Sequence, residues 1–285
     1  MSTNQSHPTV VVTGATGAVG GQVARILGSS DVRQRLLARS PDRLPQVDGA
    51  EPYRFTGYTD RVGGAKALRG ADTLFMVSAE EAADRLDHHR ALIDVAVAAG
   101  VQHIVYTSFY GAGPDCTFTL GRDHFATEEH IRRSGVDFTF LRDNFYLDVL
   151  PLFADEQGVI RGPAGQGRLS GVARDDVAAC AAEILADPGA HVGATYDLTG
   201  REELTLDEAA AVIAAVQGRE VRFQDETLEE AYASRRQWDA EPWQYDAWVS
   251  TYTAIAHGEC AGLSDDVHRL VGRQPMTLAE LLATA

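Results

Sequence analysis

Lysine is almost absent from this chain. It occurs once in 285 residues, at Lys66, and arginine supplies the rest of the 25 basic residues. Acidic residues number 41, so the formal net charge is −16. This balance argues against a broad nucleic-acid surface, because phosphate binding needs many basic side chains. It still permits an anionic cofactor, since a helix N-terminus with one or two arginines supplies enough local positive potential.

The single lysine also excludes a catalytic motif. Short-chain dehydrogenases generally use a Tyr-x-x-x-Lys pair to donate a proton, but Val62 stands four residues before Lys66. An alcohol dehydrogenase or nucleotide-sugar epimerase of that mechanism is therefore disfavoured. The sequence has no G-x-S-x-G nucleophile motif and no H-E-x-x-H zinc motif either.

Cysteine is scarce as well. Cys116, Cys180 and Cys260 are odd in number and far apart, which fits neither a disulfide framework nor a C-x-x-C site. No apolar run approaches the length of a membrane span, and residues 1–8 lack the features of a signal peptide. We therefore expect a cytoplasmic protein with no membrane partner and no metal.

What the sequence does contain is a glycine turn near its start. The β-branched run Thr9–Val12 predicts a buried strand, and glycines follow it at positions 14, 17 and 20. Directly after such a strand, G-x-x-G-x-x-G predicts a dinucleotide-binding turn that receives a pyrophosphate at a helix N-terminus. A purely structural glycine turn is the alternative. The predicted cofactor contacts here are Gly14, Thr16, Gly17, Ala18, Val19 and Gly20.

Strands and helices alternate along the first two thirds of the chain. Apolar runs predict further strands at 35–38, 52–56, 73–77, 103–107 and 138–142, with helices near 21–27, 81–99 and 123–134. This alternation predicts an α/β fold with a Rossmann-type doubly wound parallel sheet. We expect an NAD(P)-binding domain over 1–150 and a smaller, mostly helical, discontinuous substrate region over 151–285. In that region we expect a hairpin of 159–160 with 168–170, and a strand at 195–198 that returns to the sheet.

The end of the second strand bears on cofactor choice. NAD-binding folds place an acidic residue there for the ribose hydroxyls, but this chain has Arg39 followed by Ser40. A guanidinium at that place pairs with a 2′-phosphate, so the sequence favours NADP(H) over NAD(H). An ordinary surface arginine is the alternative.

Other residues are expected near the cofactor from their places in the fold. Tyr58 lies in a loop at the adenine end, where it either stacks on the ring or stays in solvent. At the carboxyl ends of later strands the predicted contacts are Val77, Ser78, Ala79, Tyr106, Thr107, Ser108 and Asn144. The adjacent pair His88 and His89 points to different helix faces, and we interpret both as surface residues.

Several stretches resemble an atypical short-chain dehydrogenase/reductase of the NmrA-like family, close to type 2 NAD(P)H:quinone oxidoreductases and triphenylmethane reductases. The resemblance runs nearly end to end. It is carried by Thr13–Gly17, Ala38–Pro41, His103–Ser108, His124–Glu128, Phe140–Tyr146, Leu263–Val267 and Leu270–Arg273. It implies direct hydride transfer from NADPH to an electron-poor acceptor, in an aromatic-lined pocket that excludes water.

The resemblance also suggests which residues face the acceptor. His124 and Tyr146 are candidate catalytic residues. For His124 an equal alternative is a structural histidine at a helix N-terminus that hydrogen-bonds to the backbone. The expected pocket residues are Tyr110, Asp143, Phe145, Trp243 and Trp248. For the tryptophan stretch, a lid on a flat substrate competes with a stripe that buries the C-terminal helices on the body or on a second subunit.

One position departs from the resemblance, because Asp143 stands where relatives usually have asparagine. The expected partner is a small aromatic or quinone-like substrate, and the protein is expected to be a monomer or homodimer. NmrA-like proteins also include NADP-binding redox sensors that regulate a partner, and that alternative stays open.

Overall fold

The structure, a computed structural model, describes residues 8–284. It divides into two compact units that interleave along the chain. The first contains the chain up to Ser108 together with Ala126–Leu141 and Val177–Tyr196. The second contains Phe109–Phe125, Arg142–Asp176 and the chain from Asp197 onward. The functional division expected near residue 150 stays a prediction.

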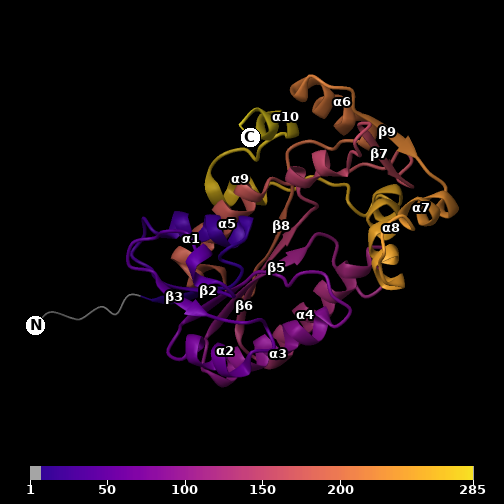
Figure 1. Ribbon diagram of the computed structural model, residues 1–285. Helices are drawn as coiled ribbons and strands as arrows, with labels where there is room; N and C mark the ends of the chain where they lie inside the picture. The colour runs from indigo at the N-terminus through magenta and orange to yellow at the C-terminus, as the bar shows by residue number, and fades with distance from the viewer. Residues whose placement is uncertain (1–7, 285) are drawn as a thin grey trace, which may run out of the picture. The chain divides into compact units, whose positions relative to one another are not determined.

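A seven-stranded parallel sheet has the strand order β3-β2-β1-β4-β5-β6-β8 (Figure 1). The first six strands in this order form the arrangement of a Rossmann fold, so the predicted α/β fold is confirmed. Strand β8 lies at the edge beside β6. The strands are β1 (Thr9–Val12), β2 (Arg33–Ala38), β3 (Glu51–Arg54), β4 (Thr73–Met76), β5 (His103–Phe109), β6 (Asp137–Asp143) and β8 (Thr195–Leu198).

Strand β1 is an interior strand of this sheet, between β2 and β4. It pairs in parallel with β2 on one side and β4 on the other, so that Val10 lies opposite Gln34 and Thr73. Val10, Val11 and Val12 are fully buried, because a parallel sheet is covered on both faces. Burying each such side chain stabilises the fold by about 1.5–3 kcal/mol. The β-branched composition of this run therefore explains both the strand and its interior place in the sheet.

Helices cover the two faces of the sheet in the first unit (Figure 1). Helix α1 (Ala18–Leu27) and helix α5 (Arg174–Ala186) lie over one face, while α2 (Arg61–Leu68) and α3 (Arg85–Ala98) lie over the other. Helix α4 (Thr119–Ser134) follows α3. The core of this unit includes Leu37, Leu74, Met76, Ile93, Ile104 and Phe140.

The second unit contains a short sheet that the sequence did not predict. Strand β7 (Val159–Gly162) pairs in parallel with β9 (Arg222–Asp225), so the expected hairpin of 159–160 with 168–170 is wrong. Leu169 instead forms an isolated antiparallel bridge with Leu204. The Gly-Pro-rich turn after β7 does reverse the chain, but turn composition does not choose the partner of a strand.

The rest of the second unit is mostly helical. Its core includes Leu147, Ile160, Leu206, Ile213 and Tyr252. Helix α6 lies beside β9 and α10, and α7 lies beside α8 (Figure 1). The helical segments are η2 (Leu147–Phe153), α6 (Leu206–Gln217), α7 (Leu228–Arg235), α8 (Pro242–Ala256), α9 (Asp266–Val271) and α10 (Leu278–Ala283).

Candidate cofactor and acceptor sites

The glycine turn connects β1 to α1 in the form that its spacing predicts. Gly14 has a φ of +60°, which an L side chain rarely adopts, and its carbonyl accepts the Gly17 N–H at 2.8 Å. A Cβ on Gly20 would lie only 2.5 Å from the Gly14 oxygen. The helix therefore approaches the turn so closely that only glycine fits at position 20.

The N-terminus of α1 suits an anionic group. Gly17 is its N-cap; no side chain of the described residues caps the helix, and its first turn carries no acidic residue. The first N–H groups of such a helix need acceptors, and the helix dipole favours negative charge beside them. Thr16, Gly17 and Ala18 are exposed, whereas Val19 is buried, so Val19 has only its backbone to offer. These residues fit the pyrophosphate of a dinucleotide.

The segment Val77–Ala79 leaves the carboxyl end of β4 and is held by three neighbours. Thr13 Oγ1 accepts the Val77 N–H at 2.9 Å, and Thr107 Oγ1 accepts the Ser78 N–H at 2.8 Å. The Ala79 N–H donates to His89 Nε2 at 2.9 Å. This segment therefore has a fixed backbone beside the glycine turn, since β1 and β4 are neighbours.

Tyr58 is one of the residues that fix it. Its hydroxyl donates to the Val77 carbonyl and lies 2.8 Å from Thr13 Oγ1. Burial raises the pKa of this phenol, so it stays protonated. The Tyr58 hydroxyl is thus hydrogen-bonded within the protein, and stacking of its ring on adenine stays a prediction.

His89 is fully buried on α3, so its interpretation as a surface residue was wrong. Nε2 accepts the Ala79 N–H, which places the ring proton on Nδ1, and Nδ1 lies 2.8 Å from Thr127 Oγ1. Burial, with a smaller effect of Arg85, lowers the pKa of His89 to about 2. A neutral imidazole therefore links α3 to the β4 segment. The neighbouring His88 does lie near the surface and pairs with Asp84 at 3.2 Å.

Arg39 and Ser40 follow β2 and are exposed, with Arg39 available at the surface. The Arg39 guanidinium lies 3.4 Å from Glu80, and both side chains are more than two thirds exposed, at 72% and 74%. A solvated pair of this kind is weak, about 0–1 kcal/mol. A phosphate could therefore replace Glu80 as the partner of Arg39 at little cost.

The three residues of β5 that were predicted to contact the cofactor, Tyr106, Thr107 and Ser108, lie in different environments. Tyr106 is fully buried, so its side chain belongs to the core and only its backbone is left for a cofactor. The Thr107 hydroxyl oxygen accepts the Ser78 N–H. Ser108 donates to Glu128 at 2.5 Å, and Glu128 is fully buried and pairs with Arg132 at 3.1 Å.

The second unit contains a cluster of three phenylalanines, formed by Phe109, Phe118 and Phe145. Their ring centroids are 4.8, 4.9 and 5.1 Å apart, and the His124 ring lies 6.1 Å from Phe109. His124 itself is only 6% exposed. Sequence reasoning named Phe145 but missed Phe109 and Phe118. The signal was available for Phe109, because it ends β5, next to the strand that precedes Phe145.

Asp143 and Tyr146 form a hydrogen-bonded pair just past β6. The Tyr146 hydroxyl donates to Asp143 Oδ2. Asp143 is 5% exposed, and burial raises the pKa of its carboxyl to about 7. The structure thus brings together Tyr146, which was predicted as catalytic, and Asp143, which stands where relatives usually have asparagine.

Asn144 and Tyr110 have structural partners. The Asn144 amide donates to Ser170 Oγ at 3.0 Å and to the Cys260 carbonyl at 2.9 Å, and it accepts the Phe145 N–H. The Tyr110 hydroxyl donates to the Ala261 carbonyl at 2.9 Å. Cofactor contact by Asn144 and acceptor contact by Tyr110 stay predictions.

Trp243 and Trp248 lie on α8 and are half-buried. Trp248 packs edge-on against Trp238 and Tyr245, with centroids 6.1 and 5.7 Å away. Tyr252, on the same predicted stripe, is buried against Phe153, at 5.9 Å. Part of the stripe therefore packs α8 within its own unit, while a lid role for Trp243 and Trp248 stays a prediction.

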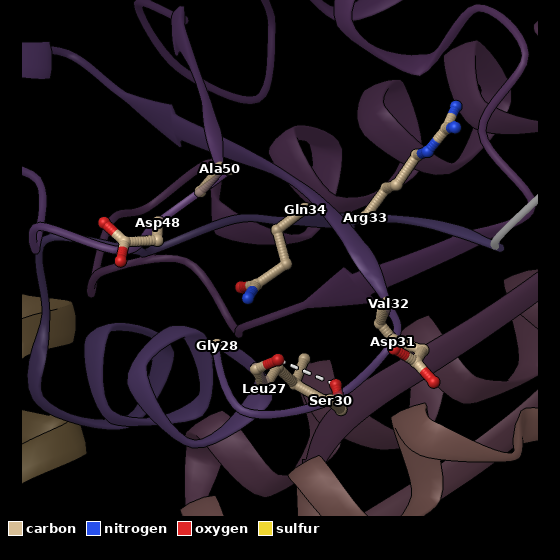
Figure 2. A pocket seen from close by; sticks show the side chains of 10 residues that line it. Leu27, Gly28, Ser30, Asp31, Val32, Arg33, Gln34, Asp48 and Ala50 are labelled. Carbon is tan, nitrogen blue, oxygen red and sulfur yellow. Dashed lines mark hydrogen bonds between the residues drawn. The ribbon is translucent and has the colours of Figure 1, made fainter.

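A separate hollow of about 210 Å³ lies in the first unit, at the end of α1 and the start of β2 (Figure 2). The side-chain amide of Gln34 lies in the middle of this view, and it donates to the Ala24 carbonyl at 3.1 Å. Asp31 and Asp48 lie on opposite sides of it. Since α1 is ten residues long, about 15 Å separates this hollow from the glycine turn. It is not the predicted cofactor site.

The described residues contain neither a candidate membrane span nor a candidate metal cluster. No helix of residues 8–284 is long and apolar enough to cross a membrane. Within the same residues, no group of three or more histidine, cysteine or acidic side chains is placed to hold a metal ion.

Comparison with known proteins identifies the family. A family described as NAD(P)H-binding matches residues 14–188. The chain is 30% identical over 275 residues to the NAD(P)H azoreductase of Xenophilus azovorans, covering 95% of this chain and 96% of that protein. It is also 30% identical over 280 residues to quinone oxidoreductase 2 of Escherichia coli (strain K12), covering 95% and 96%.

Solved structures agree with these sequence matches. The NADPH-dependent quinone oxidoreductase QOR2 of Escherichia coli, complexed with NADPH, gives a TM-score of 0.85 at 29% identity, covering 96% of this chain and 99% of that one. The triphenylmethane reductase of Citrobacter sp., complexed with NADP(H), gives 0.81 at 28% identity, covering 97% and 99%. The transcriptional regulator Nmra gives 0.74 at 19% identity, which shows the fold alone.

The fold and the glycine turn are those of a dinucleotide-binding protein, and the comparisons make it a reductase. The chain belongs to the NAD(P)H-binding family, in its NmrA-like group. It is an NAD(P)H-dependent oxidoreductase of the quinone, azo and dye reductase type.

Proposed function

We propose that this protein uses NADPH to reduce quinones or similar conjugated aromatic compounds by direct hydride transfer. The observation that carries the proposal is the glycine turn and uncapped N-terminus of α1, with Arg39 where NAD-binding folds have an acid. When bound, the cofactor supplies the hydride. The protein's part is then to hold cofactor and acceptor and to exclude water.

Preference for NADPH rests on Arg39. Its ion-pair partner, Glu80, is an exposed carboxylate that a 2′-phosphate can displace. Ser40 follows it and can add a hydroxyl hydrogen bond to the same phosphate. The remaining predicted cofactor contacts stay part of the proposal, with Tyr106 limited to its backbone.

The acceptor class rests on the phenylalanine cluster. Three rings at centroid distances near 5 Å suit flat conjugated compounds, because aromatic surfaces pack on one another. The named substrates of the relatives (quinones, azo compounds and triphenylmethane dyes) share such flat, electron-poor systems. His124 and Tyr146 remain the two candidates for handling a proton, and Trp243 and Trp248 remain candidate pocket residues.

The proposal includes a cytoplasmic location and a monomer or homodimer, as the sequence suggests. Among the described residues the three cysteines are free thiols, which suits a reducing compartment.

The test measures binding and turnover on one sample. Purified protein is titrated with NADPH and NADH, then mixed without oxygen with a panel of quinones and cationic dyes while NADPH absorbance is followed. We expect NADPH to bind more tightly than NADH and to be consumed well above the protein-free rate. Tight binding without consumption by any acceptor contradicts the proposal and favours an NADP(H)-binding sensor.

A further inference from the structure

The Asp143–Tyr146 pair joins a buried carboxyl to the phenol of a half-buried tyrosine. Asp143 ends β6 and is 5% exposed, whereas Tyr146 is half-buried. The Tyr146 hydroxyl donates to Asp143 Oδ2. The carboxyl and the phenol are therefore in direct hydrogen-bond contact, close enough to exchange a proton.

Few charges act on this pair. The Arg174 guanidinium lies 4.9 Å from the centre of the Tyr146 ring, and the backbone N–H of Arg174 donates to Asp148 Oδ2 at 2.9 Å. Tyr110, which directly follows β5, reaches the pair through its backbone N–H, which donates to the Asp143 carbonyl. The neighbours that influence its ionisation are thus one arginine and one further carboxylate, Asp148.

Burial dominates the ionisation of both members. It raises the pKa of Asp143 to about 7, although the Tyr146 hydrogen bond and Arg174 act in the opposite direction. Burial and the adjacent carboxyl also raise the pKa of Tyr146. Near neutral pH, Asp143 is therefore partly protonated and the Tyr146 phenol keeps its proton.

We propose that Asp143 stores the proton that Tyr146 delivers to a carbonyl acceptor during reduction. The inference rests on the proposed function and assigns Tyr146, not His124, as the proton donor. Tyr146 contacts the acceptor and is the catalytic residue, whereas Asp143 acts through it.

The proton inventory closes in this scheme. A quinone that receives a hydride gains two electrons and one hydrogen, and one of its oxygens becomes an oxyanion. That oxyanion takes the phenolic proton of Tyr146. In the protonated form of Asp143 the carboxyl donates to the Tyr146 oxygen, so the carboxyl proton moves to that oxygen in the same step. Asp143 is left as a carboxylate and regains a proton from water after product leaves.

This step gives the pair a signature that depends on the acceptor. A quinone needs the proton to become a hydroquinone. A cationic triphenylmethane dye needs none, because hydride addition to its central carbon already gives a neutral product. Loss of Asp143 should therefore affect the two acceptors unequally.

The experiment compares both acceptors in the full-length protein. Asp143→Asn and Tyr146→Phe are nearly isosteric. The matched controls are Asp246→Asn and Tyr232→Phe, which remove an exposed tyrosine–aspartate hydrogen bond of 2.8 Å in the same unit. At pH 6 we expect kcat for the quinone to fall about 100-fold in both site variants. We expect kcat for the dye to change by less than about twofold, with the controls like wild type for both acceptors.

A second readout needs no turnover. A carboxyl ¹³C NMR titration of cofactor-free protein should show one carboxyl that titrates near pH 7, absent in Asp143→Asn and moved upward in Tyr146→Phe.

Three results would overturn the inference. Equal losses for quinone and dye would make the pair structural, and no loss for the quinone would exclude proton delivery by it. An Asp143 carboxyl that titrates below pH 5 would hold no proton near neutral pH and could not supply one to Tyr146. If the wild type reduces neither acceptor, the proposed function itself fails, and this inference fails with it.

Discussion

Arg39 is the residue on which the proposed preference for NADPH depends. Its guanidinium is exposed after β2 and pairs with the equally exposed Glu80. A charge-assisted contact with a 2′-phosphate is worth about 1.5–3 kcal/mol, whereas NADH offers no such group.

Arg39→Ala should therefore weaken NADPH binding about 10- to 100-fold and NADH binding by less than about twofold. Fluorescence titration with each cofactor measures this, and Arg61→Ala at the exposed start of α2 is the control. An equal loss for both cofactors, or none for either, would remove the 2′-phosphate argument.

Asp143 makes the stability of the fold depend on pH. Its ordinary pKa is 3.8 and its folded pKa is about 7, so between these values the folded state binds more protons than the unfolded state. The stability that the protonated carboxyl contributes is complete below pH 4 and is lost as the pH rises through 7.

Asp143→Asn carries no titrating group at this position. Relative to wild type, its free energy of unfolding should rise between pH 4 and 8 by up to about 4 kcal/mol. Urea unfolding of both proteins across this range measures the difference. A constant difference would show that Asp143 ionises in the folded protein much as it does in water.

At the scale of elements, the close packing of α1 on the glycine turn shapes the proposed cofactor site. A Cβ at Gly20 would lie 2.5 Å from the Gly14 carbonyl oxygen and 2.8 Å from that of Thr13, so the helix would have to move away. Gly20→Ala should weaken NADPH binding by at least about tenfold. Gly189→Ala, whose Cβ would meet no heavy atom nearer than 3.7 Å, should bind like wild type in the same titration. Unchanged binding by Gly20→Ala would show that the turn tolerates displacement of α1.

His89 couples α3 to the end of β4. Its pKa falls from the ordinary 6.5 to about 2 on folding, so below pH 6.5 the unfolded state binds more protons and the folded state loses stability. His89→Gln retains a side-chain acceptor and does not titrate.

Wild type should therefore lose about 2 kcal/mol more unfolding free energy than His89→Gln between pH 7.5 and pH 5. Urea unfolding at the two pH values checks this. Equal acid sensitivity would mean that the His89 ring is not held neutral.

At the scale of the whole molecule, the sequence predicts the seven strands of the large sheet, because most of them are short apolar runs bounded by turn residues. It does not predict β9, since Arg222–Asp225 is mostly polar and becomes a strand only through pairing with β7. It also misplaces His89, because sequence spacing does not show which helix face meets the sheet.

The candidate site also contains one part that the sequence predicts and other parts that it does not. The glycine turn is predictable because its geometry is local: a strand end, a left-handed glycine and a helix start within a few residues. The Asp143–Tyr146 hydrogen bond depends on how the chain leaves β6, and the phenylalanine cluster joins residues from three separate segments. Residue types alone do not specify such arrangements.

Direct hydride transfer to a conjugated acceptor is the central claim, and one labelling experiment tests it. The protein is supplied with NADPH that carries deuterium at the transferred position of C4, together with a cationic triphenylmethane dye. Mass spectrometry then measures the deuterium on the central carbon of the reduced dye. We expect one deuterium per molecule of product, because hydride passes from cofactor to acceptor without exchange with water. Product formed without the label, or no product above the protein-free control, would contradict the claim.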